Sequence, residues 1–322
     1  MNNDKLMFTQ QLLRGKESKH IRSIGDNIAC CNFDIDGEII IGTHNGIFHA
    51  DDALAVALLV MESQCQNYQV VRSRVPADFV DCDFVVDVSE GLLDHHGSRA
   101  EAGVAACTRV LQLILQSEQQ YNNRTWVDFL REVISPMVEK VAAQDTGSSV
   151  VDHPFPWVHP LAAADGIRQR RGEKVDSFRD VVERILQELK ARWIAFDIAA
   201  EARQAAEEHL TDHPYDPVVV FPDSCREAEV KKLLWCSQHP AVFYVSKEAD
   251  NDYRVLCAAP VDQEFSFFGS KMLLPERFRS LRGEELSAAC GIPGGIFCHA
   301  AGFIAGFDTE AGATDFAKLC LE

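Results

Sequence analysis

The order of apolar and polar positions predicts an α/β chain. Residues 37–42 contain three consecutive isoleucines, a short β-branched run typical of a strand buried in a parallel sheet. A polar turn follows at 43–46. The alanine- and leucine-rich segment 51–62 then predicts a helix, with two acidic residues in its first turn. Strand, loop and helix in this order open an α/β unit.

Similar patterns continue to a long amphipathic segment with apolar residues at helical spacing. Pro214 and Pro217 close this segment, and the composition changes there, so we place a domain boundary near residue 212. The expected strands are 69–74 and 83–88, and the expected helices are 100–116, 126–143 and 176–210.

The C-terminal part predicts a smaller α/β domain with a mixed or antiparallel sheet. Its expected strands are 218–221, 241–245 and 253–258, and its expected helices are 224–235, 283–289 and 309–321, with a glycine-rich segment at 291–306. The domains are therefore 37–212 and 213–322. Residues 1–36 form an N-terminal extension, for which a disordered segment and an organelle presequence both stay open.

The charge balance argues against a general affinity for nucleic acid. Lysine and arginine total 31 against 49 acidic residues, a net charge of −18 in 322 residues. Binding to the phosphate backbone depends on basic surface, although a local basic channel is compatible with this total. A chain of this length buries a core without metal staples, so a bound metal would serve chemistry.

The cysteines indicate an intracellular protein. Eleven are scattered with no CxxC pair, which favours reduced thiols over a zinc knuckle. No apolar run approaches the ~20 residues that span a bilayer. We expect a soluble protein without a membrane partner, cytoplasmic by default, with mitochondrial and nuclear locations still open; a homo-oligomer is also compatible with the sequence.

Acidic residues and histidines follow the ends of successive elements. In an open α/β sheet, ligands bind beyond the carboxyl ends of the strands. A single aspartate there is more often a cap or turn residue, but four such groups are hard to assign to capping. The groups are His44, His49, Asp51 and Asp52; Asp87; Asp94, His95 and His96; and Asp145.

Imidazole with carboxylate suits manganese, iron or zinc better than calcium or magnesium, which prefer oxygen ligands. Two cations ~3.5–4 Å apart could bind the attacking and leaving oxygens of a displacement at phosphorus. Asp87 is the natural ligand to bridge them. His153, His159, His209, His213 and His239 are interpreted as ordinary loop or surface histidines.

Longer motifs resemble a known family. THNGIFHADDA at 43–53, VRSRVP at 71–76, CDFVVDV at 82–88, DHH at 94–96 and QDTG at 144–147 occur in order, and LPERFRSLRGEE and GIPGGIFCHAAGF follow near the C-terminus. This series resembles the Myg (melanocyte proliferating gene) family, within or beside the DHH superfamily of metal-dependent phosphoesterases and exonucleases. The resemblance covers about residues 37–320.

The resemblance implies a DHH-type catalytic domain with a parallel sheet and a smaller substrate-binding domain. It implies one cation on His44, His49 and Asp87, and another on Asp51, Asp87, His95 and Asp145. His96 would face the scissile phosphate. Mn²⁺ is the expected cation, with Mg²⁺, Fe²⁺ or Zn²⁺ as alternatives.

The expected substrate contacts come from the glycine-rich segment and from arginines. Glycine lets the backbone approach a phosphate closely, and arginine binds phosphate as a fork of donors. The candidates are Arg72, Arg74, Arg282, Gly294, Gly295 and His299.

The leading hypothesis is hydrolysis of a phosphodiester by a water activated between two metals. The resemblance implies a 3′–5′ exonuclease acting on RNA or short oligonucleotides. Two alternatives stay open. One is a hydrolase of small phosphoanhydrides or cyclic dinucleotides, which the negative charge favours; the other is a catalytically inactive nucleotide- or RNA-binding protein.

Overall fold

The contacts of the chain divide it into two compact units, Met1–Ile194 and Ala195–Glu322. Helix α7 (Phe178–Asp212) crosses this division, whereas we expected the boundary at the end of that helix, near residue 212. The computed structural model describes residues 21–24, 27–31, 37–65, 67–88, 92–96, 101–121, 124–148, 150, 152–260, 264, 266 and 269–322.

The sheet of unit 1 is parallel, as the isoleucine run predicts. Strand β3 (Glu38–Thr43) lies between β4 (Asn67–Arg72) and β5 (Phe84–Val85). A further parallel bridge joins Val86 to Leu93 and extends the sheet beyond β5. The segments that follow these strands therefore leave the sheet at one edge.

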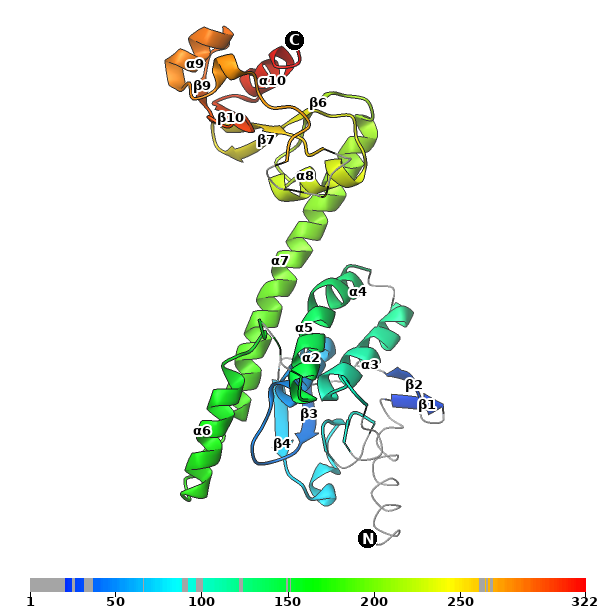
Figure 1. Cartoon of the computed structure of the whole chain (residues 1–322). Coiled ribbons are helices and arrows are strands. Elements are labelled where there is room, and N and C mark those ends of the chain that lie inside the picture. The colour runs from blue at the N-terminus through cyan, green and yellow to red at the C-terminus, as the bar shows by residue number, and fades with distance from the viewer. Residues whose placement is uncertain are drawn as a thin grey trace. The chain divides into compact units, whose positions relative to one another are not determined.

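Helices of unit 1 gather beside this sheet (Figure 1). Helix α2 is buried over nearly its whole length and packs against α3 and α5. The helix expected at 126–143 is interrupted by a π-helical turn, and α6 was not predicted. The bounds are α2 (Ala50–Ser63), α3 (Ala106–Tyr121), α4 (Arg124–Phe129), the π-helix Leu130–Ile134, α5 (Ser135–Asp145) and α6 (Val158–Arg170).

Part of the N-terminal extension forms strands. Strand β1 (Ile21–Ile24) pairs antiparallel with β2 (Asn27–Cys31), and β2 lies against α3. Residues 1–20 and 32–36 lie outside the described residues, and so does the expectation for them. Among the helices that the structure describes, none is long and apolar enough to cross a membrane.

Unit 2 contains a five-stranded mixed sheet, which confirms the predicted class. The strand order is β6-β7-β8-β10-β9, with β6 parallel to β7 and the other pairs antiparallel. Apolar clusters cover both faces. The elements are β6 (Val218–Val220), α8 (Glu227–Cys236), β7 (Phe243–Ala249), β8 (Asp252–Cys257), α9 (Gly283–Cys290), β9 (Gly295–Cys298), β10 (Ile304–Phe307) and α10 (Glu310–Leu319).

A glycine in β3 permits close packing beside the edge that carries the acidic residues. A Cβ on Gly42 would lie 2.5 Å from Cδ1 of Phe79, at the end of the 3₁₀ helix Pro76–Phe79. Both residues belong to described, well-packed parts of unit 1, and Phe79 is buried.

We expect Gly42→Ala to destabilise unit 1 by about 1–3 kcal/mol, because the added methyl group overpacks this contact. The measurement is the free energy of unfolding in urea. In the double variant with Phe79→Leu the total loss should be smaller than the sum of the single losses. Strictly additive losses would show that the Phe79 ring is not what the methyl group meets.

Candidate metal centre

The edge where the strands of unit 1 end collects the acidic residues and histidines. His44 follows β3 directly, and His49 is the N-cap residue of α2, whose first turn carries Asp51 and Asp52. Asp87 lies just after the bridge at Val86, in the left-handed region with φ +53°. Asp94, His95 and His96 follow Leu93, and Asp145 ends α5.

His44 is buried and faces two carboxylates. Its Nε2 lies 2.9 Å from Oδ2 of Asp52 and 3.3 Å from Oδ2 of Asp87. Its Nδ1 contacts the carbonyl oxygen of Asn45 at 3.1 Å, which places a hydrogen on Nδ1. Nε2 is therefore the nitrogen that a cation could bind once it has lost its proton.

His95 connects Asp87 with Asp145. Its Nδ1 lies 2.9 Å from Oδ1 of Asp87, and its Nε2 lies 3.0 Å from Oδ2 of Asp145. The nearest oxygen of Asp51 is 3.9 Å from Nδ1. His49, whose side chain is 48% exposed, reaches Asp145 at 3.4 Å. All six predicted metal ligands therefore meet in one cluster.

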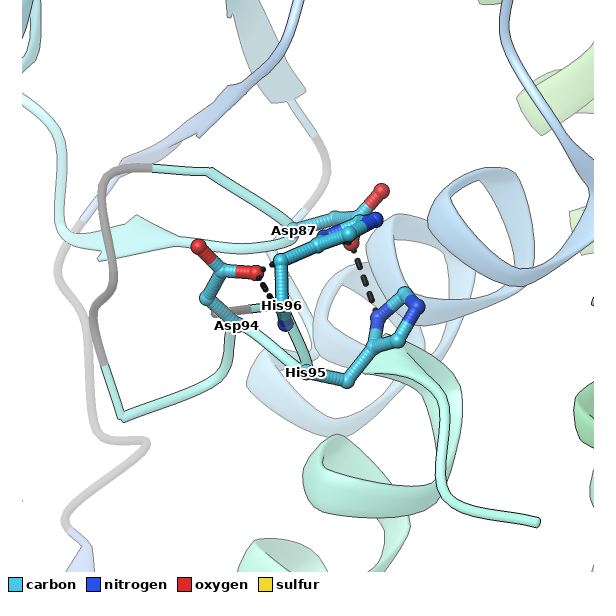
Figure 2. A group of neighbouring side chains, drawn as sticks. All are labelled: Asp87, Asp94, His95 and His96. Atoms are coloured by element: carbon cyan, nitrogen blue, oxygen red, sulfur yellow. Dashed lines mark hydrogen bonds and ion pairs between the residues drawn. The ribbon is translucent and has the colours of Figure 1, made fainter. Parts of the chain in front are cut away.

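His96 lies on the open side of this cluster, and its side chain is 62% exposed. Figure 2 shows its ring beside Asp87 and Asp94. Its Nδ1 lies 3.0 Å from Oδ1 of Asp94 and 3.1 Å from Oδ1 of Asp87. The same Asp94 oxygen accepts a hydrogen bond from the backbone N–H of His96. Asp94 therefore fixes the orientation of His96 through Nδ1 and the backbone N–H.

The side chains form three groups in which each member offers one ligand atom to a common point. Asp87 belongs to two of them, as a bridging ligand would. His49 is grouped with Asp51 and Asp145 rather than with His44, because its ring turns from the cap of α2 toward the end of α5. The groups are His44, Asp52 and Asp87; Asp87, Asp94, His95 and His96; and His49, Asp51 and Asp145.

Asp51 provides the test of whether these residues suit a cation. Its side chain is fully buried, and neither oxygen has a hydrogen-bond partner among the described residues. An ionised carboxylate in such a place is costly unless it is paired or coordinates a metal. The donor set of imidazoles and carboxylates also suits a first-row transition ion. The residues therefore fit a divalent cation.

The pKa values show how protons compensate the charge when no cation is bound. Burial alone would lower the pKa of His44, but contacts with Asp52 and Asp87 outweigh it and raise the value to about 10. The same balance, through Asp145 and Asp87, raises the pKa of His95 to about 10. Burial would raise the pKa of Asp87, yet the two imidazoles lower it to about 2.

Sequence reasoning missed two kinds of neighbour. Asp52 and Asp94 were noted within motifs but not predicted as ligands, although both are buried in the cluster. His153 and His159, interpreted as ordinary histidines, line a cavity of about 190 Å³ together with His49, Asp51 and Asp145. Their proline-rich segment carries no pattern that would have indicated this position.

The residues that we expected to contact substrate differ in their exposure and in their bonds to the protein. The side chain of Arg72 is 9% exposed, and each of its three nitrogens bonds to a protein oxygen. Arg74 and Arg282 are exposed. A Cβ on Gly294, where φ is +80°, would overlap the Asp308 carboxylate, so packing alone requires this glycine.

The two remaining candidates lie in the same segment of unit 2. The backbone N–H of Gly295 donates to Oγ of Ser287. His299 is exposed, and its Nδ1 accepts from the N–H of Ala301.

We expect Asp51→Asn to have opposite effects on metal binding and on metal-free stability. Burial, and then Asp52 and Asp87, raise the pKa of Asp51 above its ordinary value. At pH values above the ordinary carboxyl pKa, Asp51 therefore takes up a proton when the protein folds. The stability of the folded state falls as the pH rises toward the raised pKa. The asparagine removes this loss but also removes a charged ligand.

Thermal unfolding of EDTA-treated protein between about pH 5 and 8 measures the first effect, since the advantage of the variant should grow with pH. Mn²⁺ titration measures the second, and we expect binding at least ~10-fold weaker. Asp180→Asn, an exposed substitution on α7, is the matched control. A destabilised metal-free Asp51→Asn protein would contradict the charge argument.

Comparisons with known proteins place the sequence motifs in one protein family. The profile of the MYG1 exonuclease family, described as Uncharacterised protein family (UPF0160), matches residues 40–101 and 132–321. The MYG1 exonuclease of Rattus norvegicus is 30% identical, over 87% of this chain and 84% of the relative. The MYG1 exonuclease of Homo sapiens is 29% identical, over 87% and 85%.

The MYG1 protein of Chlamydia trachomatis is 25% identical, over 88% of this chain and 96% of the relative. Among solved structures, RecJ of Thermus thermophilus in complex with Mg²⁺ aligns with 98% of this chain and 52% of its own, at 14% identity and a TM-score of 0.25. Because the family profile matches most of its length, this chain belongs to the MYG1 exonuclease family.

Proposed function

We propose that this protein is a metal-dependent phosphodiester hydrolase, an exonuclease acting on RNA or short oligonucleotides. The observation that carries the proposal is the cluster in which the six predicted ligands lie in three adjoining groups, with Asp51 fully buried and neither of its oxygens hydrogen-bonded among the described residues. The names of the mammalian relatives, which are MYG1 exonucleases, support the choice of a nuclease. The 3′–5′ direction rests on the DHH-type motifs alone.

We assign the cations to two sides of Asp87. His44 and Asp87 would hold one cation, with Asp52 beside them. His95 and Asp87 would hold the other, with Asp145 and Asp51 beside them, and His49 lies with Asp51 and Asp145. When bound, two such cations neutralise charge on phosphoryl oxygens and lower the pKa of an attacking water. We expect Mn²⁺, because the donor set mixes imidazole with carboxylate.

We propose that His96 is the group that touches substrate. Asp94 and Asp87 engage its Nδ1–H, so the protonated imidazole would donate from Nε2 to a phosphoryl oxygen or to the leaving group. The buried Asp94 contacts Nδ1 of this ring and orients it, as a carboxylate does when it positions a catalytic imidazole.

Unit 2 supplies the candidate substrate-binding segment. Its exposed His299 and Arg282 are available to a phosphate or sugar, and Arg74 is available in unit 1. We keep these three as proposed substrate contacts.

The charge of −18 favours a second candidate function, hydrolysis of a small phosphoanhydride or a cyclic dinucleotide. A short substrate needs only a local positive site, whereas a long polyanion meets the repulsion of the whole chain. Rates on pyrophosphate, dinucleotides and longer RNA, measured with the same Mn²⁺-loaded protein, separate the two functions.

We expect Asp87→Ala to abolish shortening of end-labelled RNA in the presence of Mn²⁺. The substitution removes the carboxylate shared by two of the three ligand groups, so both cations lose a ligand. The measurement is the rate of product formation, with Asp180→Ala as the exposed control. Full activity of the Asp87 variant would exclude the two-metal assignment.

We expect His96→Gln to lower kcat by roughly 10²–10⁴-fold while Mn²⁺ still binds. Glutamine keeps a donor but cannot transfer a proton, and the buried ligands stay in place. Steady-state kinetics and a parallel metal titration measure the two effects. If instead the variant no longer binds metal, His96 is a ligand and not the group that faces the substrate.

A further inference from the structure

Arg72 holds the loop that follows β3. It ends β4 and pairs in register with Thr43, the residue before His44. Its Nε donates to the carbonyl oxygen of His44 at 3.2 Å, and its Nη2 donates to that of Gly46 at 2.9 Å. Its Nη1 forms an ion pair with Oδ1 of Asp176 at 2.5 Å. All three nitrogens are therefore committed to protein oxygens.

Two buried rings enclose the same guanidinium. Its Cζ lies 4.6 Å from the ring centroid of Phe178 and 5.5 Å from that of Phe48, and the two rings meet edge to face. Phe48 precedes His49 in the chain. We call Arg72, Asp176, Phe48 and Phe178 the Arg72 clamp. Arginine suits it because a planar fork can bond in its plane and stack on its faces at once.

Loop 44–49 lacks regular secondary structure, so side-chain bonds help to fix its backbone, in addition to the hydrogen bond from the N–H of His49 to Asp52. Residues 44–49 contain no helix or strand, and Gly46 has φ +94° with open space where a Cβ would lie. Asn45 and Gly46 are exposed, yet the loop must place His44 and His49 on their carboxylates. Bonds to two carbonyl oxygens define the path of the backbone without using either imidazole.

The clamp also reaches the start of helix α7. Oδ1 of Asp176 accepts a hydrogen bond from the N–H of Phe178, the first residue of that helix, as well as from Arg72. The loop and the beginning of α7 are thus tied to one carboxylate.

We propose that Arg72 is a positioning residue of the metal centre, and that it acts on His44 and His49 through the backbone of loop 44–49 rather than by binding substrate. The part of this inference that concerns cations rests on the proposed function. The part that concerns the loop applies to the metal-free protein as well.

The test compares Arg72→Ala and Arg72→Lys with Arg74→Ala, an exposed arginine two residues away in the same motif. Hydrogen exchange of the amides of 44–49 is measured in EDTA-treated protein, and Mn²⁺ affinity is measured without substrate. For Arg72→Ala we expect faster exchange and roughly 10- to 100-fold weaker Mn²⁺ binding, the usual loss when a partner of a ligand is removed.

Arg72→Lys should lie between this variant and the wild type, because an ammonium keeps the charge but loses the fork. Arg74→Ala should change neither measure. If Arg72→Ala does not fold, Asp176→Asn is the second variant. It removes only the negative charge of Asp176. We expect smaller changes in amide exchange and Mn²⁺ affinity than in Arg72→Ala, in the same direction.

Unchanged exchange and unchanged Mn²⁺ affinity, with only KM for the oligonucleotide raised, would overturn the proposal and return Arg72 to substrate binding. Unchanged values in a folded Asp176→Asn protein would overturn the role of that carboxylate in the clamp. If Mn²⁺ binds neither wild type nor variants, the proposed function fails, while faster exchange in Arg72→Ala still supports the clamp.

Discussion

The burial of like charges is the constraint on which unit 1 depends. Five carboxylates, those of Asp51, Asp52, Asp87, Asp94 and Asp145, lie close together, and four of them are almost entirely shielded from water. Each buried charge costs several kcal/mol unless it is paired. The imidazoles of His44 and His95 supply pairing in the metal-free protein, and their raised pKa values express it. Positive charge at this edge is required, as protons or as cations.

A parallel sheet is well suited to meet this constraint. Its strands all end at the same side of the sheet. The polar residues that follow β3, β5 and the bridge at Leu93 therefore lie close together. The end of α5 brings Asp145 from another direction. The left-handed backbone of Asp87 is an unfavourable conformation for a residue with a side chain, of order 1–3 kcal/mol, and such positions cluster at functional sites.

The strand-end argument predicted much of this arrangement because it depends only on chain order. Whether a segment forms a strand or a helix can be predicted from its local pattern of residues. The isoleucine run of β3 and the helix that begins at Ala50 are examples. The grouping of His49 with Asp145 could not be predicted, because it depends on the direction of a side chain at the cap of α2.

Other features escaped prediction because they depend on distant residues. Strands β9 and β10 lie in a glycine-rich segment that weakens any local strand pattern, and β10 is completed by pairing with β8. The surroundings of Arg72 were equally hidden, since its partner Asp176 is remote in sequence. The motif containing Arg72 led us to predict a substrate contact, because the bonds of its side chain to a loop backbone cannot be read from the sequence.

The spread of the cluster along the chain sets an order of events during biogenesis. Its members come from residue 44 through residue 145, a stretch that contains strands β4 and β5 and several helices. An unfolded chain therefore has no short segment that carries the complete ligand set, unlike a zinc finger, which gathers its ligands locally and folds around the metal. Insertion follows folding, so which ion the mature protein acquires is decided by the metals its compartment offers and by their relative affinities. Overproduction in a foreign host, with a different supply of metals, would then yield correctly folded protein carrying the wrong ion.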